Sequence, residues 1–478
     1  MITKSEIKIF ISAAIMIFCT TLLAFASDGG EDIGNSLPIW SIIPFVGMLL
    51  SIAIFPLVKP EWWEEKQLWV ALFWAACFLI PFGIVYGGHH LLYEMSEMIL
   101  GDYLTFIVLL FGLFVAAGGI ALKGSLVGTT KVNCILLIIG TLLSSWVGTT
   151  GSAMLMIRPI IKANAWREKK AHVIIFFIFT VANLGGCLTP VGDPPLFLGF
   201  LRGVPFFWTM RIFPIMCFNA AILLIVFALL DRKLAKKELA EGRKPEDMIT
   251  GEKEKIHIEG AHNFLFVAMI VGAVILTGIL AAPERLGTSG VEVFGYTFQY
   301  CYMIQVVIIL LAAFLSMKTT KKEIREFNGF TFAPIAEVAK LFIGIFLTMI
   351  PALALLRTHG ASLGLSNPWQ FFWITGALSS FLDNAPTYLV FMTTAGSLGA
   401  TEGLATAVGT IAEKLLLAIS CGAVFMGANT YIGNAPNFMV KSIAEENKIK
   451  MPSFFGYMKW SLLILIPTFL IDTVVFFL

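Results

Sequence analysis

Long apolar stretches alternate with short polar segments along almost the whole chain. Each stretch has at least the roughly 20 residues that a helix needs to cross the hydrocarbon core of a bilayer. Their approximate ranges are 38–58, 67–87, 103–122, 132–157, 172–200, 205–230, 262–282, 297–316, 334–356, 367–395, 405–440 and 455–477. The pattern predicts an all-α polytopic membrane protein.

Two of these stretches carry polar residues, glycine or proline near their middles. The stretch 132–157 contains Gly148-Thr149-Thr150-Gly151, and 367–395 contains Asp383-Asn384-Ala385-Pro386-Thr387. We interpret each as a re-entrant hairpin that enters and leaves the membrane on the same side. The remaining stretches then give about ten transmembrane helices.

Two of the predicted crossings contain a break of their own. The sequence Gly192-Asp193-Pro194-Pro195 interrupts one, and Gly433-Asn434-Ala435-Pro436 interrupts the other. Proline removes a backbone donor and clashes with the preceding turn, so a helix cannot run through these segments undisturbed. Irregular backbone at membrane depth must be buried in protein or line a wet cavity.

The basic residues support this topology. Cytoplasmic loops of membrane proteins are enriched in Lys and Arg, and most of the 33 Lys and Arg residues fall in loops that the topology places inside. Those predicted outside are Arg202, Arg211, Arg285 and Arg357. Arg158 and Arg357 are expected at the membrane boundary, with anion binding as the alternative.

Four regions are predicted along the chain. Residues 1–26 carry Lys4 and Lys8, an apolar centre and Ala24-Phe25-Ala26, the pattern of a secretory signal peptide; a first transmembrane helix is the alternative. Residues 38–230 and 262–478 form two halves. The segment 231–261 is rich in Lys, Arg and Glu, which favours a solvated cytoplasmic linker loop.

The two halves repeat the same three motifs in the same order. Phe111-Gly112-Leu113-Phe114 matches Ile343-Gly344-Ile345-Phe346, and Ser144-Ser145 matches Ser379-Ser380, each followed by a hairpin tip. Thr189 to Pro195 then matches Thr430 to Pro436. In the predicted topology the halves run in opposite directions. Inverted repeats with interrupted helices at the midplane are typical of secondary transporters.

Composition excludes several other classes of function. Hydrophobic residues make up 58% of the chain and charged residues 13%, with a net charge of +2. No phosphate-binding loop, Ser/His/Asp arrangement or long basic arm is present in the sequence. We therefore expect a multi-pass protein of the bacterial inner membrane that is not an enzyme, has no cofactor and does not bind nucleic acid.

The candidate site residues are the polar side chains at the tips and breaks. Their carboxylate, amide and hydroxyl oxygens suit a hard cation such as Na⁺, and they are Thr149, Thr150, Asp193, Asp383, Asn384, Thr387, Thr430, Asn434 and Asn437. Asp193 and Asp383 are the candidate Na⁺ ligands, because ionisable groups inside a membrane are by default functional. The alternative is a carboxylate that only caps a broken helix.

Four segments resemble the ion-transporter superfamily. They are SSWVGTTGSAMLMIRP (144–159), TPVGDPPLFLGFLRG (189–203), SSFLDNAPTYLVF (379–391) and GANTYIGNAPNFMVKSIAEE (427–446). The chain is most similar to the branch of citrate transporter-like proteins and bacterial D-type sodium–proton antiporters. The resemblance implies a scaffold and a transport domain with two opposed hairpins, and a homo-oligomer. Arsenite permease relatives often carry Asn where this chain has Leu196.

Three functions follow in order of preference. The first is Na⁺/H⁺ antiport, in which two midplane carboxylates exchange a cation for a proton. The second is Na⁺- or H⁺-coupled transport of citrate or another carboxylate, and the third is a channel or a non-transporting membrane scaffold. If Asp383 carries the exchanged proton, Asp383→Asn is expected to abolish cation-dependent proton movement, and Asp193→Asn tests the mirrored position.

Overall fold

The computed structural model describes residues 33–242 and 255–478. The predicted signal segment 1–26 lies outside the described residues, as does 243–254 within the predicted linker. The α-helices are α2 (Ile43–Val58), α3 (Pro60–Tyr86), α4 (Gly88–Ser96), α5 (Thr105–Ala117), α6 (Thr130–Val147), α7 (Thr149–Ala163), α8 (Ala171–Thr180), α9 (Pro194–Leu201), α10 (Phe213–Ala240), α11 (Asn263–Leu280), α12 (Tyr300–Thr319), α13 (Lys322–Phe327), α14 (Ala333–His359), α15 (Pro368–Ser379), α16 (Asn384–Gly396), α17 (Glu413–Met426), α18 (Ala435–Glu446) and α19 (Phe454–Asp472).

Shorter elements join or extend these helices. The 3₁₀ turns are η1 (Ile33–Asn35), η2 (Ile39–Ile42), η4 (Leu184–Leu188), η5 (Phe206–Ile212), η7 (Gly360–Leu363) and η8 (Gly427–Asn429), and the π-helical turns are η3 (Glu97–Leu104) and η9 (Thr473–Phe477). Three antiparallel strand pairs complete the described fold: β1 (Ala121–Lys123) with β2 (His257–Glu259), β3 (Gly290–Val293) with β4 (Tyr296–Gln299), and β5 (Leu404–Thr406) with β6 (Gly409–Ile411).

The protein is an all-α polytopic membrane protein, as the hydrophobic pattern predicts. Among the described residues, 10 helical segments are long and apolar enough to cross a membrane. One of them, Thr130–Val147, is an arm of the first predicted hairpin. The predicted crossing 405–440 is not among them, because it is divided into a strand pair and the helices α17 and α18.

Both predicted hairpins are pairs of helices joined by a tight turn. The helices α6 and α7 meet at Gly148, whose φ of 82° is a left-handed value that favours glycine. The helices α15 and α16 are separated only by Ser380–Asp383, and α15 begins with a capping box between Asn367 and Gln370. The polar tip sequences therefore stand where one helix ends and the next begins.

The two predicted helix breaks are also present. In the first, α8 is followed by the 3₁₀ turn η4 and a further turn at residues 189–193 before α9 begins at Pro194; in the second, α17 and η8 precede α18, which begins at Ala435. Proline occupies the first turn of α9 and α18, where its missing N–H has no helical partner to lose.

Two segments are more helical than the sequence indicates. Residues 88–100, which lie between the apolar stretches 67–87 and 103–122, belong to α4 and η3, so this crossing runs continuously from Gly88 to Ala117. Apolar residues continue through this segment, and the turn from α3 is made by Gly87 alone, at a φ of 87°. The helix α10 continues into the predicted linker as far as Ala240, and the first described range ends at residue 242.

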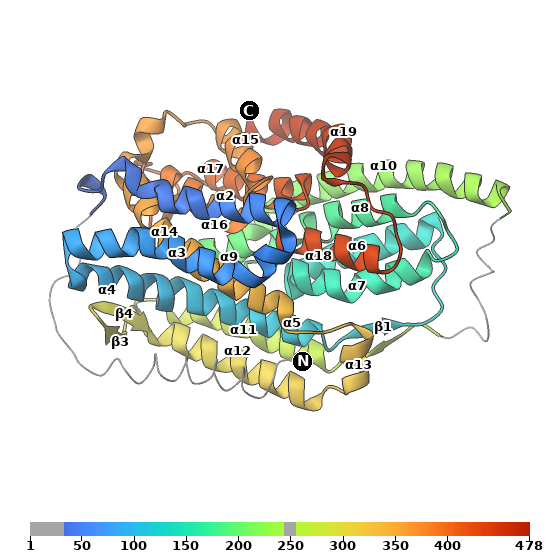
Figure 1. Cartoon of the computed structure of the whole chain (residues 1–478), viewed down its shortest axis with the longest axis horizontal. Coiled ribbons are helices and arrows are strands. Elements are labelled where there is room, and N and C mark those ends of the chain that lie inside the picture. Colours follow the sequence, from blue (N-terminus) through green and yellow to red (C-terminus); the bar gives the residue numbers. More distant parts are fainter. Residues whose placement is uncertain (1–32, 243–254) are drawn as a thin grey trace.

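The helices form two packed groups. In the first group, α5 packs on α11 and α12, and α14 packs on α2 and α3; in the second, α6 packs on α7, α15 packs on α17, and α9 packs on α16. From the first group, α5 contacts α7 and α9 of the second group, and α14 contacts α16. Figure 1 shows α11 and α12 along one side of the molecule and α15 and α19 along the opposite side.

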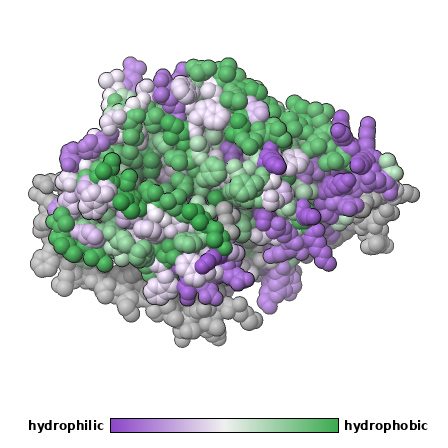
Figure 2. All heavy atoms as spheres, turned by 45° about the horizontal axis from the view of Figure 1, so that its top comes forward, coloured by the Kyte–Doolittle hydropathy of each residue, from purple (hydrophilic) through white to green (hydrophobic). Residues whose placement is uncertain are grey.

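Polar surface is concentrated at one end of the molecule. On the face in Figure 2, hydrophilic residues gather at the end where Figure 1 places the end of α10, and apolar residues cover much of the rest. The exposed cations Arg232, Lys233, Lys236 and Lys237 lie on this part of α10. This is the end that the positive-inside rule predicts to be cytoplasmic.

Candidate functional site

Matching hydrogen bonds hold each broken crossing against its hairpin. The hydroxyl of Thr189 donates to the carbonyl oxygen of Ser145, and the hydroxyl of Thr430 donates to the carbonyl oxygen of Ser380. These four residues occupy equivalent positions in the motifs shared by the two halves. The motif match therefore corresponds to one repeated contact, although the boundaries of the halves remain predictions.

The first hairpin tip lies directly on the first break. The backbone N–H of Thr149 donates to the carbonyl of Gly192 over 2.9 Å. A Cβ atom at Gly192 would lie 2.2 Å from the carbonyl oxygen of Gly186, so only glycine allows this close approach. Thr149 and Asp193 are thereby fixed next to each other.

Asp193 is the residue at which the two halves meet. Its side chain is only 1% exposed. The Thr149 hydroxyl donates to Oδ1 over 3.0 Å, the Asn384 amide donates to Oδ2 over 2.7 Å, and the Asn434 amide donates to Oδ1 over 3.3 Å. One carboxylate thus joins the first hairpin, the second hairpin and the second break.

No basic side chain among the described residues forms an ion pair with Asp193. All three of its hydrogen-bond partners are neutral, and none of the ion pairs found in 33–242 and 255–478 includes it. Removing an ionised carboxylate from water without a countercharge costs several kcal/mol. The carboxylate is therefore stable in this position when it holds a proton or a bound cation.

The two aspartates play different structural parts. Asp383 is half-buried and caps α16: its Oδ1 accepts from the N–H of Ala385 over 3.0 Å. Asp193 precedes α9 in the equivalent way but makes no capping bond to that helix. The capping alternative that the sequence leaves open thus describes Asp383, while Asp193 turns its carboxylate toward the other half.

The amides of the second break extend the polar cluster. Asn434 also donates to the Oδ1 of Asn183 over 3.2 Å, and Asn183 donates to the Oδ1 of Asn437 over 2.7 Å. Asn437 in turn donates to the carbonyls of Gly427 and Thr430 over 2.8 and 2.9 Å. Asn183 has no counterpart in the repeated motifs, and its isolation within an apolar run is the only signal in the sequence.

The remaining candidate residues lie near the cluster without joining it. The hydroxyl of Thr387 donates to the backbone carbonyl of Asp383 over 3.0 Å. Thr430 is committed to Ser380 and accepts from the N–H groups of Ile432 and Gly433. The hydroxyl groups of Thr387 and Thr430 are therefore both bonded to backbone carbonyl groups. Thr150 instead lines a neighbouring cleft.

That cleft borders the cluster at Thr149. It has a cavity volume of about 60 Å³ and lies between the first hairpin and break, at Thr149, Thr150 and Pro194, and the helices α5 and α14. Pro334, in the first turn of α14, stands on the far wall. Because α14 begins at the predicted cytoplasmic end, the cleft opens toward that side.

Four helices begin at the cluster. The first residues of α7, α9, α16 and α18 are Thr149, Pro194, Asn384 and Ala435. A helix N-terminus carries roughly half a positive charge, so these ends offset part of the negative charge of an ionised Asp193 or of another anion. Within the described residues, no group of three or more His, Cys, Asp or Glu side chains is placed to hold a metal ion. Amide, hydroxyl and carboxylate oxygens are the available ligands.

Comparison with known proteins identifies the group to which this arrangement belongs. Residues 34–477 match the model of a family described as "putative citrate transport". The chain belongs to this family. No curated protein matched the chain. The citrate-transport family is a membrane transporter family, which agrees with the many membrane-spanning helices, and the match covers both hairpins and both breaks. The predicted resemblance to the citrate transporter-like branch is confirmed.

Proposed function

We propose that this member of the citrate-transport family is a Na⁺/H⁺ antiporter of the bacterial inner membrane, with Asp193 as the group that binds either ion. The observation that supports this function is a carboxylate that is 1% exposed and has only neutral partners. Such a group needs one positive charge, and a proton or Na⁺ can supply it. The two ions then compete for a single site, which couples their movements.

The neighbours of Asp193 supply further oxygen ligands for Na⁺. The Oδ1 atom of Asn384 is buried and has no hydrogen-bond partner. Rotation of this amide would exchange its donor for its acceptor next to the Asp193 carboxylate. Together with the Thr149 hydroxyl, this change would convert a set of donors around the carboxylate into a set of hard oxygen ligands.

The second candidate is coupled transport of citrate or another carboxylate. The family description favours it, and the helix N-termini and the amides of Asn384, Asn434 and Asn437 could donate to a carboxylate substrate. The negative charge of Asp193 opposes an anionic substrate unless a cation binds first. In this alternative Na⁺ at Asp193 is the coupling ion rather than the exchanged one.

Transport in proteoliposomes tests the proposal. We expect Na⁺ or Li⁺ added outside to release protons from acid-loaded vesicles, with citrate having no effect of its own. Asp193→Asn keeps the size of the side chain and should abolish this exchange. Saturable citrate uptake that requires Na⁺, without proton exchange, would instead establish the second candidate.

Asp472 provides a matched control. It is also a fully buried aspartate, and Asn219 donates to both of its oxygens over 3.0 and 2.9 Å, but it lies on α19 and contacts neither hairpin tip through a hydrogen bond. Asp472→Asn should leave the Na⁺ dependence of proton release unchanged. Equal loss in both variants would show only that a buried aspartate is needed for folding.

A further inference from the structure

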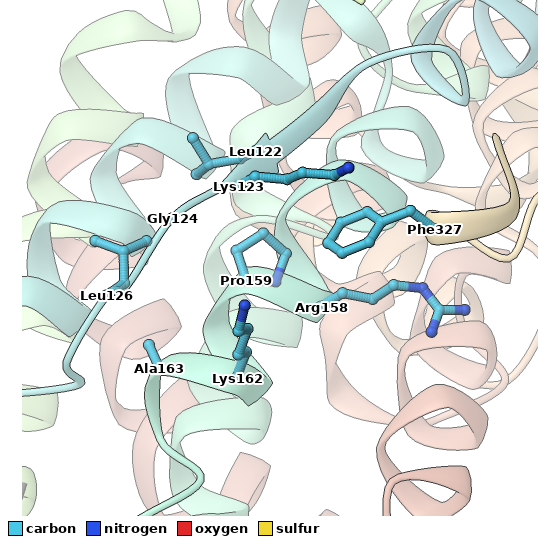
Figure 3. A pocket seen from close by; sticks show the side chains of 9 residues that line it. All are labelled: Leu122, Lys123, Gly124, Leu126, Arg158, Pro159, Lys162, Ala163 and Phe327. Carbon is cyan, nitrogen blue, oxygen red and sulfur yellow. The ribbon is translucent and has the colours of Figure 1, made fainter. Parts of the chain in front are cut away.

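A second polar pocket lies at the predicted cytoplasmic end, apart from the Asp193 cluster. It has a cavity volume of about 20 Å³ and lies between the strand β1 with the residues that follow it, the end of α7, and α13. Figure 3 shows the three cations that line it, Lys123, Arg158 and Lys162, together with the ring of Phe327. The ion exchange proposed above does not use this pocket, although anion binding at Arg158 is one of the alternatives that the sequence leaves open.

The charges in the pocket are only partly compensated. Lys123 pairs with Glu259 over 2.8 Å, and its ammonium group lies 5.0 Å from the centre of the Phe327 ring. Neither Arg158 nor Lys162 takes part in any ion pair among the described residues. One carboxylate thus faces three cations, leaving an excess of positive charge.

Arg158 is half-buried and differs in its partners from the three buried arginines, Arg167, Arg202 and Arg325. Arg167 and Arg202 each pair with an aspartate, and Arg325 donates to the carbonyl of Val115 and the hydroxyl of Ser316. The Nε atoms of Arg158, Arg167 and Arg325 are all buried without a hydrogen-bond acceptor, but of these three Arg158 alone makes no other hydrogen bond or ion pair within the described residues. A buried donor of this kind costs free energy unless an acceptor is supplied. A bound oxyanion would supply one.

We propose that this pocket binds a phosphoryl group through Arg158, Lys162 and Lys123. A guanidinium group donates two parallel hydrogen bonds to phosphate oxygens, and lysine adds a mobile point charge. Basic pockets between transmembrane helices on the cytoplasmic side hold phosphate-bearing lipid headgroups, and a soluble phosphate offers the same chemistry. The phosphoryl group is therefore the ligand, and its source is either of these two.

Binding in this pocket would affect the transport site through the helix α7. Arg158 and Lys162 lie on α7, which begins with Thr149 at the Asp193 cluster, whereas Lys123 and Phe327 belong to β1 and α13. At 1.5 Å per residue, Arg158 is about 14 Å along α7 from Thr149. A phosphoryl group held from both sides would tie the first hairpin to α13 and restrain its movement. This inference does not depend on which ion is transported.

The thermal-unfolding midpoint of the purified full chain in detergent measures binding. Inorganic phosphate and a short-chain phosphatidic acid are titrated separately at constant ionic strength, with short-chain phosphatidylcholine as the lipid blank. We expect at least one phosphoryl probe to raise the midpoint in a saturable way. A response to inorganic phosphate indicates a soluble source, and a response to phosphatidic acid alone indicates a lipid headgroup.

Variants assign the response to this pocket. Arg158→Gln and Lys162→Gln should each weaken the apparent affinity about tenfold, the loss expected for one charge-assisted contact. Lys162 is exposed, so its variant tests the pocket even if Arg158→Gln does not fold. Lys322→Gln is the control, since Lys322 lies on α13 but pairs with Glu326 at 3.0 Å outside the pocket. Absence of any response, or unchanged affinity in Lys162→Gln, overturns the proposal.

Discussion

The amide of Asn384 donates a hydrogen bond of 2.7 Å to the carboxylate of Asp193, across 191 positions of sequence. Asn384 starts α16 in the second hairpin, and Asp193 precedes α9 in the first broken crossing. The bond therefore joins the two halves at the group that we propose to exchange Na⁺ and H⁺. It also gives the transport site a partner that can be removed without touching the carboxylate.

Removal of this partner should weaken Na⁺ binding more than it weakens the fold. Asn384→Ala deletes one donor to Asp193 and one oxygen ligand, so we expect the Na⁺ concentration for half-maximal exchange to rise about tenfold. Asn219→Ala removes the equivalent donor from Asp472 and serves as the control. Proton release in proteoliposomes measures both. An equal rise in the two variants would contradict a special role for Asn384.

Asp383 should act chiefly as a helix cap. Asp383→Asn keeps an oxygen that can accept from the N–H of Ala385, so we expect substantial Na⁺-dependent proton release in this variant. Asp383→Ala removes the cap and should lower the free energy of unfolding by about 1 kcal/mol. Exchange assays and thermal unfolding separate the two effects. Complete loss of exchange in Asp383→Asn would return the proton-carrying role to Asp383.

The sequence predicts where the backbone breaks but not which side chains meet there. Gly148, Gly192 and the prolines of α9 mark the hairpin tip and the break, because glycine permits backbone geometries closed to other residues and proline fixes φ, in any surroundings. Asp193 bonds to the second half and Asp383 caps its own helix, and this difference depends on side-chain rotamers and on contacts between distant segments. The sequence gives both residues the same position before a helix, so it ranks them almost equally.

Asn183 shows the limit of motif matching most clearly. It belongs to no repeated pattern, yet it bridges Asn434 and Asn437. The sequence does not indicate the extension of α10 for a related reason. Asp231 belongs to a charged segment that predicts a linker, but in the structure it is buried and pairs with Arg167 and His172. Each of these contacts depends on a partner more than 50 residues away, which local pattern cannot reveal.

Asn183 should therefore matter for transport. Asn183→Ala removes the donor to Asn437 and the acceptor for Asn434, so we expect the apparent Na⁺ affinity to fall by about tenfold. The control is Asn133→Ala, because Asn133 and Asn164 form a buried reciprocal amide pair at 2.9 and 2.8 Å elsewhere on the first hairpin. Na⁺ titration of proton release compares the variants. Unchanged affinity in Asn183→Ala would confine its role to packing.

The Asp231 cluster should contribute to stability rather than to exchange. Asp231 is fully buried and accepts from Arg167, His172 and Thr130. Asp231→Asn leaves the guanidinium group of Arg167 without its countercharge and should lower the free energy of unfolding by about 3–5 kcal/mol. Replacing Asp231 and Arg167 together by leucine should cost less than Asp231→Asn alone. Thermal unfolding tests this order. The reverse order would show that the ion pair between Asp231 and Arg167 is not the main contribution of this cluster to the free energy of unfolding.

The central claim is that Na⁺ and a proton compete for the Asp193 carboxylate. It is tested most directly by adding Na⁺ to the purified protein in weakly buffered solution and measuring the protons released with a pH-sensitive dye. We predict saturable release approaching one proton per Na⁺ bound at acidic pH, a lower apparent Na⁺ affinity as pH falls, and no release from Asp193→Asn. Release of the same size from Asp193→Asn, or Na⁺ binding without any proton release at all pH values, would contradict the account.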